Sequence, residues 1–262
     1  MSTFPALFLS HGSPMLALED GPAHRFLKEL GPRLGKPRAI LSVSAHWETS
    51  VPTVSLAATP ETIHDFGGFP QALFDMRYPA PGAPDVAEET ARYLLEAGFQ
   101  AQAHPSRGLD HGTWVPLSLM YPQADVPVAQ LSIQPAEGPE HHYRMGRALR
   151  PLRDKGVLIM ASGSLTHNLR EVFSPRRRGE TDTPDWVSRF GDWMAQAIEE
   201  RRTDNLLNYR AHAPHAVQNH PTDEHLLPLF VALGAGAADI AGVPLHRSHS
   251  YGVLAMDAYA FA

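Results

Sequence analysis

The stretch Ala6-Leu7-Phe8-Leu9-Ser10-His11-Gly12 decides the fold class of this 262-residue chain. It is a short apolar run that stops at a histidine and a glycine, which is typical of a buried strand that enters a loop. The stretch from Ala39 to Ala45 has the same character and stops at His46. Between the two, residues 21–34 carry apolar side chains at helical spacing, and Gly35 follows them as a terminator. The order strand, helix, strand predicts an α/β domain.

The rest of the chain continues this alternation. Continuous apolar runs predict further buried strands at 126–133, 156–161 and 251–256. Helical spacing predicts helices at 85–97, 140–153, 184–201 and 225–233. No composition shift marks a domain boundary, so we expect one domain over residues 1–262, with a covered sheet at its centre.

Two segments lack regular periodicity. Residues 60–84 are dense in proline and glycine, and an irregular segment of this length inside a domain is more often a functional loop than a linker. Residues 173–184 are rich in charge and proline, and their basic run 176–178 is expected to be a solvated loop.

The charge balance limits the partners of the chain. It has 22 Lys and Arg against 28 Asp and Glu, a net charge of −6, which argues against nucleic-acid binding. No apolar stretch is long enough to span a membrane. The first residues do not have the pattern of a signal peptide, so a cytoplasmic location is expected.

The chain has 15 histidines and no cysteine. This excludes disulfides, thiolate metal sites and a cysteine nucleophile. Any metal chemistry must therefore use imidazole and carboxylate groups, and imidazole is the commonest protein ligand for metals.

Three histidines follow predicted strands. His11 and His46 follow the first two strands, and His167 follows the strand at 156–161 through a turn of small residues. Ligands of open α/β sheets bind beyond the carboxyl ends of the strands. We therefore expect these imidazoles to converge if their strands are neighbours.

A fourth segment lies at the predicted start of the helix at 225–233. Thr222 is the expected N-cap, with acidic residues after it. Four side chains there can ligate a metal, and spacing does not choose among them: His220, Asp223, Glu224 and His225.

His111 and His64 complete the candidates. His111 lies between an acid and a glycine near a predicted helix start, and His64 lies in the loop at 60–84. The chain has no nucleophile elbow, no phosphate-binding glycine loop and no dinucleotide fingerprint. A mononuclear centre remains, and the pattern leaves open Fe(II) for oxygen chemistry or Zn(II) for hydrolysis.

Seven motifs in order resemble the 4,5-DOPA extradiol dioxygenase family, which belongs to the class III extradiol ring-cleaving enzymes. They cover the chain from about residue 5 to residue 258: Leu9-Ser10-His11-Gly12-Ser13-Pro14-Met15, Ser44-Ala45-His46-Trp47, Ile63-His64-Asp65-Phe66-Gly67-Gly68-Phe69-Pro70, Tyr78-Pro79-Ala80-Pro81-Gly82, Asp110-His111-Gly112, His167-Asn168-Leu169-Arg170 and Pro221-Thr222-Asp223-Glu224-His225.

The resemblance implies a central mixed sheet flanked by helices, with one divalent metal ion at the strand ends. It implies His11, His46 and His225 as metal ligands. His167 takes the position of a catalytic acid/base that is sometimes a fourth ligand, and His111 that of a second catalytic histidine. The wider superfamily uses a glutamate as third ligand, so Glu224 stays an alternative to His225.

The implied activity is extradiol cleavage of a catechol such as DOPA by O₂ at non-haem Fe(II), which gives a semialdehyde. His167 would take a catechol proton and return it. A zinc-dependent hydrolase at the same site and a non-catalytic metal-binding homologue are the alternatives. The expected partners are the catechol and O₂, with a homo-oligomer possible. Four aromatic side chains are expected to pack against the catechol ring: Trp47, Phe66, Phe69 and Trp114. A cation, Arg170 or Arg77, is expected to bind a substrate carboxylate.

Overall fold

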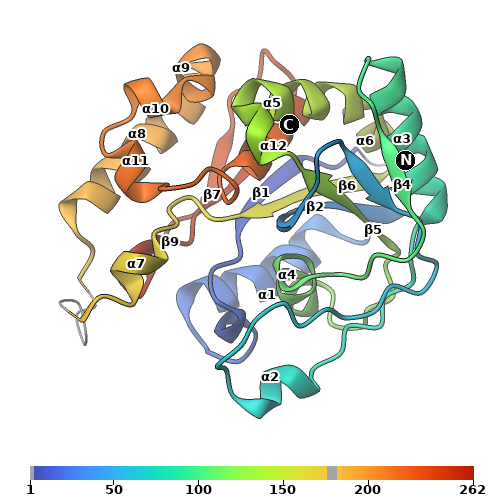
Figure 1. Ribbon diagram of the computed structural model, residues 1–262, viewed down its shortest axis with the longest axis horizontal. Coiled ribbons are helices and arrows are strands. Elements are labelled where there is room, and N and C mark those ends of the chain that lie inside the picture. Colours follow the sequence, from blue (N-terminus) through green and yellow to red (C-terminus); the bar gives the residue numbers. More distant parts are fainter. Residues whose placement is uncertain (1–2, 176–181) are drawn as a thin grey trace.

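The fold is an α/β domain built on a mixed eight-stranded sheet, as the sequence predicts (Figure 1). The structure is a computed structural model that describes residues 3–175 and 182–262. The strand order is β4-β3-β5-β2-β6-β1-β10-β7, and β8 and β9 form a separate pair. The bounds are β1 Ala6–Ser10, β2 Ala39–Glu48, β3 Thr53–Ser55, β4 Gln102–His104, β5 Val128–Ile133, β6 Val157–Gly163, β7 Val243–His246, β8 His249–Ser250, β9 Leu254–Ala255 and β10 Ala258–Phe261.

The middle of the sheet is parallel. β2 pairs with β5 and β6, and β6 pairs with β1, all in parallel register. These four strands are the continuous apolar runs, and nearly all their residues are buried, as expected for strands covered on both faces. Antiparallel pairs join β3 to β5, β10 to β1, and β7 to β10.

Helices cover both faces of the sheet (Figure 1). Helices α1 and α4 pack on Leu7, Leu9 and Ile40, whereas α3, α5 and α12 pack on the opposite face, which carries Phe8 and Leu41. The bounds are α1 Pro22–Leu34, α2 Gln71–Asp75, α3 Pro84–Glu96, α4 His111–Met120, α5 Gly138–Leu149, α6 Pro151–Asp154, α7 Leu169–Val172, α8 Asp185–Glu199, α9 Thr203–Leu207, α10 Tyr209–His212, α11 Ala216–Asn219 and α12 Leu227–Ala235. Among the described residues, no helix is long and apolar enough to cross a membrane.

The predicted strand at 251–256 is mostly wrong. Tyr251 and Gly252 have positive φ angles of 52° and 67°, which start a turn. The strand β9 that follows has two residues and pairs with β8 outside the central sheet. The last strand of that sheet is β10, which the sequence does not predict.

Two helix predictions need correction. The helix at 140–153 is two helices, α5 and α6, because a new helix begins at Pro151. Thr222 is not an N-cap, because α12 begins at Leu227 after a turn in which Asp223 O accepts the N–H of Leu226. The loop prediction for 60–84 is right apart from the single short helix α2. The basic run 176–178 lies outside the described residues.

Candidate metal centre

Three histidines meet at the carboxyl ends of the parallel strands. His11 follows β1 directly, and its N–H extends the ladder by donating to Gly163 O at 2.9 Å. His167 follows β6 after a short turn. His46 lies within β2, in a register irregularity between Val43 and Glu48, rather than after the strand as the sequence suggested.

The strands β1 and β2 are not neighbours, because β6 lies between them. Their histidines converge nevertheless, across the end of β6. The Nε2 atoms of His11 and His46 are 3.0 Å apart, and those of His46 and His225 are 3.3 Å apart. Two imidazole nitrogens bound to one metal at the usual bond length, at angles between a right angle and the tetrahedral angle, are about 3.0 to 3.4 Å apart.

Hydrogen bonds at the other ring nitrogen set the tautomers of two of these rings. Ser162 Oγ donates to the Gly112 carbonyl, so it accepts from His11 Nδ1 at 2.9 Å. The Glu224 carboxylate accepts from His225 Nδ1 at 3.0 Å. Both imidazoles therefore carry their proton on Nδ1 when neutral, and both Nε2 lone pairs face inward.

This donor set fits a divalent cation. His46 Nε2 lies against both lone pairs and can offer a proton to at most one of them. At least one pair of nitrogens therefore faces lone pair to lone pair unless a cation lies between them. Neutral imidazoles held by hydrogen bonds at the remote nitrogen are the usual ligands of Zn²⁺ and Fe²⁺.

Two more imidazoles, those of His167 and His111, border His11, His46 and His225. His167 stacks on His225 with 3.5 Å between ring centroids and 11° between planes. His111 is the first residue of α4, and its ring centroid is 4.0 Å from that of His46. Candidate ligand atoms fall into two sets, each within 4.8 Å: those of His11, His46 and His111, and those of His167, Glu224 and His225.

Two glycines allow the close approach of these segments. A Cβ atom on Gly112 would lie 2.6 Å from Ser44 Oγ. It would also lie 3.1 Å from His46 Cδ2 and 3.2 Å from His11 Cε1. A Cβ atom on Gly163 would lie 2.1 Å from the His225 carbonyl oxygen. A larger residue at either position would push a histidine out of the cluster.

Burial keeps the imidazoles of His11, His46, His167 and His225 neutral. It lowers the pKa of His11 and His225 well below the usual value, and nearby imidazoles lower these pKa values further. Burial likewise lowers the pKa of His46 to about 3 and of His167 to about 4, although carboxylates near each ring oppose the shift. Metal binding requires the deprotonated nitrogen, so these shifts favour it at neutral pH.

The other candidates of segment 219–225 point elsewhere. His220 is fully buried, and its Nε2 donates to Leu165 O at 2.8 Å, which supports the turn before His167. The Asp223 carboxylate accepts from Tyr209 and Arg210. Glu224 contacts the Nδ1 side of His225, opposite the Nε2 atom that faces the cluster.

The loop at 60–84 contributes Asp65, which the sequence reading did not single out. Its Oδ1 accepts from His111 Nδ1 at 2.9 Å, and its Oδ2 lies 3.5 Å from His46 Nδ1. Burial by itself raises the pKa of Asp65, but hydrogen bonds and charge from His111 lower it to about 2. The sequence signal for Asp65 is its position directly after His64 in the motif at 63–70. His64 itself contacts the Met76 carbonyl at 3.1 Å.

Phe66 is the predicted wall residue that meets the cluster, with its ring centroid 5.6 Å from that of His111. Phe69 and Trp114 pack behind Phe66, and Trp114 is fully buried. Trp47 instead packs against the Arg107 guanidinium. The predicted cations stay untested. Arg77 donates to backbone carbonyls of its own loop, and Arg170 is exposed on α7.

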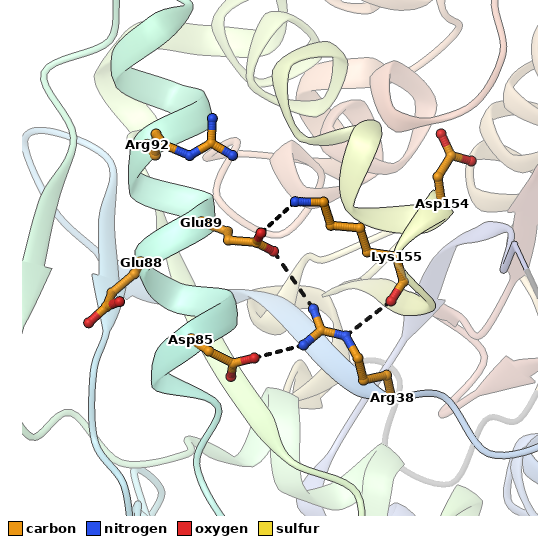
Figure 2. A pocket seen from close by; sticks show the side chains of 7 residues that line it. All are labelled: Arg38, Asp85, Glu88, Glu89, Arg92, Asp154 and Lys155. Atoms are coloured by element: carbon orange, nitrogen blue, oxygen red, sulfur yellow. Dashed lines mark hydrogen bonds and ion pairs between the residues drawn. The ribbon is translucent and has the colours of Figure 1, made fainter. Parts of the chain in front are cut away.

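A large open cavity lies at the other end of the sheet (Figure 2). Arg38, just before β2, donates to Asp85 at 2.7 Å and to the carbonyl of Lys155, just before β6. Lys155 pairs with Glu89. This cavity is at the amino ends of the parallel strands, and these charges pair with each other, so it is an ion-pair network rather than a second candidate centre.

Fold and site together define an α/β protein with a cluster of imidazoles at its strand ends that could hold a metal ion. The family model described as the catalytic LigB subunit of aromatic ring-opening dioxygenase matches residues 5–262. The chain belongs to this family of extradiol dioxygenases, so the resemblance inferred from the motifs is confirmed.

Individual relatives agree with the family assignment. The chain is 41% identical over 258 residues to a 4,5-DOPA dioxygenase extradiol of Beta vulgaris, across 97% of this chain and 95% of the relative. It is 43% identical over 234 residues to that of Escherichia coli K12, across 88% and 84%. A crystal structure of an uncharacterized protein from Escherichia coli K12 superposes with a TM-score of 0.84 at 34% identity, across 99% of this chain and all of the other.

Proposed function

We propose that the chain cleaves a DOPA-like catechol outside its two hydroxyl groups, with Fe(II) held by the Nε2 atoms of His11, His46 and His225. The observation that carries this proposal is the pair of Nε2 separations, 3.0 Å and 3.3 Å, in a cluster where the Nδ1 atoms of His11 and His225 have hydrogen-bond acceptors. The relatives from Beta vulgaris and Escherichia coli K12 are 4,5-DOPA dioxygenases, which supports DOPA as the first substrate to test.

Fe(II) held by His11, His46 and His225 would supply the redox chemistry that lets a catechol react with O₂. The protein supplies the proton transfers. His167, whose pKa is lowered to about 4, is neutral at pH 7 and can accept a hydroxyl proton from the catechol. Nδ1 of the protonated ring would then lie 3.6 Å from Glu224 Oε1. The carboxylate stabilises the cation until the proton is returned to the substrate.

His111 is the second proposed catalytic residue. Asp65 holds its Nδ1, so its Nε2 edge is directed away from Asp65. Phe66 lies edge-on to the His111 ring and offers an apolar surface for the substrate ring. The catechol ring is therefore proposed to lie against His111 and Phe66, beside the metal that His11, His46 and His225 hold.

An all-imidazole triad also holds Zn(II), which has no redox chemistry. The geometry of the three imidazoles therefore does not distinguish Fe(II) from Zn(II), and Fe(II) in the cell is part of the proposal. The cytoplasmic location expected from the sequence stays a prediction, and the oligomeric state stays open.

The test is anaerobic reconstitution with Fe(II), followed by L-DOPA and air. We expect oxygen uptake and a yellow semialdehyde. The variant His167→Phe should bind iron as the wild type does and lose turnover, and His212→Phe, which changes an exposed histidine, should retain both. No semialdehyde from several catechols, with iron shown to be bound, would refute the dioxygenase proposal. Loss of iron from His167→Phe would make His167 a ligand instead.

A further inference from the structure

Two carboxylates each lie between a proposed metal ligand and a proposed catalytic histidine. Asp65 contacts His46 and His111, and Glu224 contacts His225 and His167. In all four cases the contact is with Nδ1. The arrangement repeats although Asp65 is in the loop at 60–84 and Glu224 is in the turn before α12.

Asp65 holds His111 more tightly than His46. Its Oδ1 accepts both the backbone N–H of His111, at 3.0 Å, and the Nδ1–H, at 2.9 Å. The distance from Oδ2 to His46 Nδ1 is 3.5 Å, at the outer limit of a hydrogen bond. The two bonds to one residue fix both the start of α4 and the orientation of the His111 ring.

Glu224 shows the opposite preference. Its Oε1 is 3.0 Å from Nδ1 of the proposed ligand His225 and 3.6 Å from Nδ1 of the proposed catalytic residue His167. Because these two rings are stacked and nearly parallel, one carboxylate oxygen faces both Nδ1 atoms. The Glu224 side chain is 17% exposed, so water competes only weakly for this oxygen.

We propose that Asp65 and Glu224 are positioning residues with divided roles: Asp65 fixes the catalytic histidine His111, and Glu224 fixes the metal ligand His225. A neutral imidazole has one proton, and an acceptor at Nδ1 keeps that proton there and leaves Nε2 free for metal or substrate. Each carboxylate is assigned to the histidine whose Nδ1 is nearer, which is His111 for Asp65 and His225 for Glu224. The inference rests on the proposed function only for which imidazole binds the metal and which acts on the substrate.

The experiment compares substitutions at the two carboxylates. Asp65→Ala and Glu224→Leu remove the acceptor, whereas Asp65→Asn and Glu224→Gln retain one acceptor oxygen. Asp75→Ala and Glu88→Leu are matched controls, because both change exposed acids outside the site. Three properties are measured: Zn(II) affinity by competition with a chromophoric chelator, histidine tautomers by ¹⁵N NMR of the zinc-loaded protein, and kcat and KM of the Fe(II) enzyme with L-DOPA.

Glu224→Leu should lower Zn(II) affinity about 10- to 100-fold, the usual effect of losing the outer partner of a ligating histidine. Asp65→Ala should change Zn(II) affinity less than about 3-fold, convert His111 from the Nδ1–H form to a tautomer mixture, and lower kcat about 100-fold with little change in KM. The Asn and Gln variants should recover most of each loss, which keeps the test valid if Ala or Leu prevents folding.

Equal effects of Asp65→Ala and Glu224→Leu on Zn(II) affinity would overturn the division of roles. An unchanged His111 tautomer in Asp65→Ala would also overturn it. These two readouts use zinc alone, so a wild-type protein that cleaves no catechol would refute the proposed function without affecting this test.

Discussion

Replacing Ser162 with alanine removes the hydrogen-bond acceptor behind one proposed metal ligand. Ser162 Oγ accepts from His11 Nδ1 at 2.9 Å and donates to the Gly112 carbonyl, and both Ser162 and His11 are almost completely buried. Alanine leaves the Nδ1–H and the carbonyl without this partner. Leaving a buried polar group unsatisfied costs about 1 to 3 kcal/mol.

Two measurements follow from this loss. Urea unfolding of the metal-free protein should show Ser162→Ala destabilised by about 1 to 3 kcal/mol. Zn(II) affinity should fall about 10- to 100-fold, because His11 is free to rotate or to move its proton to Nε2. Chelator competition measures this directly and does not depend on any catalytic activity.

The control is Thr90→Val, which removes a buried hydroxyl from α3 that donates to the Val86 carbonyl at 2.7 Å. The Val86 carbonyl keeps its helical N–H partner, so stability should fall only slightly, and Zn(II) affinity should be unchanged. If Ser162→Ala binds Zn(II) as tightly as the wild type, the hydrogen bond does not orient His11, and the assignment of Nε2 as the ligating atom fails with it.

Three other predictions use the same assays. Gly112→Ala places a Cβ atom 2.6 Å from Ser44 Oγ, so it should lower stability by about 1 to 3 kcal/mol and weaken Zn(II) binding; normal binding would show that α4 shifts freely. Burial lowers the pKa of His142 to about 3, so below the unfolded value near 6.5 only the unfolded chain gains a proton there. The contribution of His142 to stability should therefore be full above pH 6.5 and be lost at about 1.4 kcal/mol per pH unit below it, so His142→Gln should reduce the overall slope of stability against pH by one proton in urea titrations from pH 7 to 5. Arg38→Ala should cost less than about 1 kcal/mol, and less still at high salt, without changing Zn(II) affinity.

The sequence identifies the middle of the sheet more reliably than its edges. β1, β2, β5 and β6 are covered on both faces, so burial alone gives them apolar sequences. β4 is exposed along its length, and β3 has three residues, so neither has such a run. β10 was missed because the apolar residues before it, at 251–256, form a turn and a strand of the small second sheet instead.

The sequence also indicates which histidines lie together but not which ring atoms face the inside of the cluster. A histidine that follows a buried parallel strand is placed by the sheet, and this applies to His11 and His167. The choice between Glu224 and His225 depends on the turn that precedes α12, and the sequence was read there as a helix start. In the turn, the Glu224 carboxylate accepts a hydrogen bond from His225 Nδ1, the ring nitrogen that is remote from the cluster.

The contacts of Asp65 and Ser162 with the histidines could not be predicted from the sequence, for a related reason. Each acts on a histidine far away in the chain: Asp65 is 46 residues from His111, and Ser162 is 151 residues from His11. A motif shows a residue beside its neighbours in sequence, whereas these hydrogen bonds exist only after the sheet has formed. An imidazole can be recognised as a candidate ligand by its place at a strand end. Its tautomer, and therefore its ability to bind a metal, is set by a partner that only the folded chain supplies.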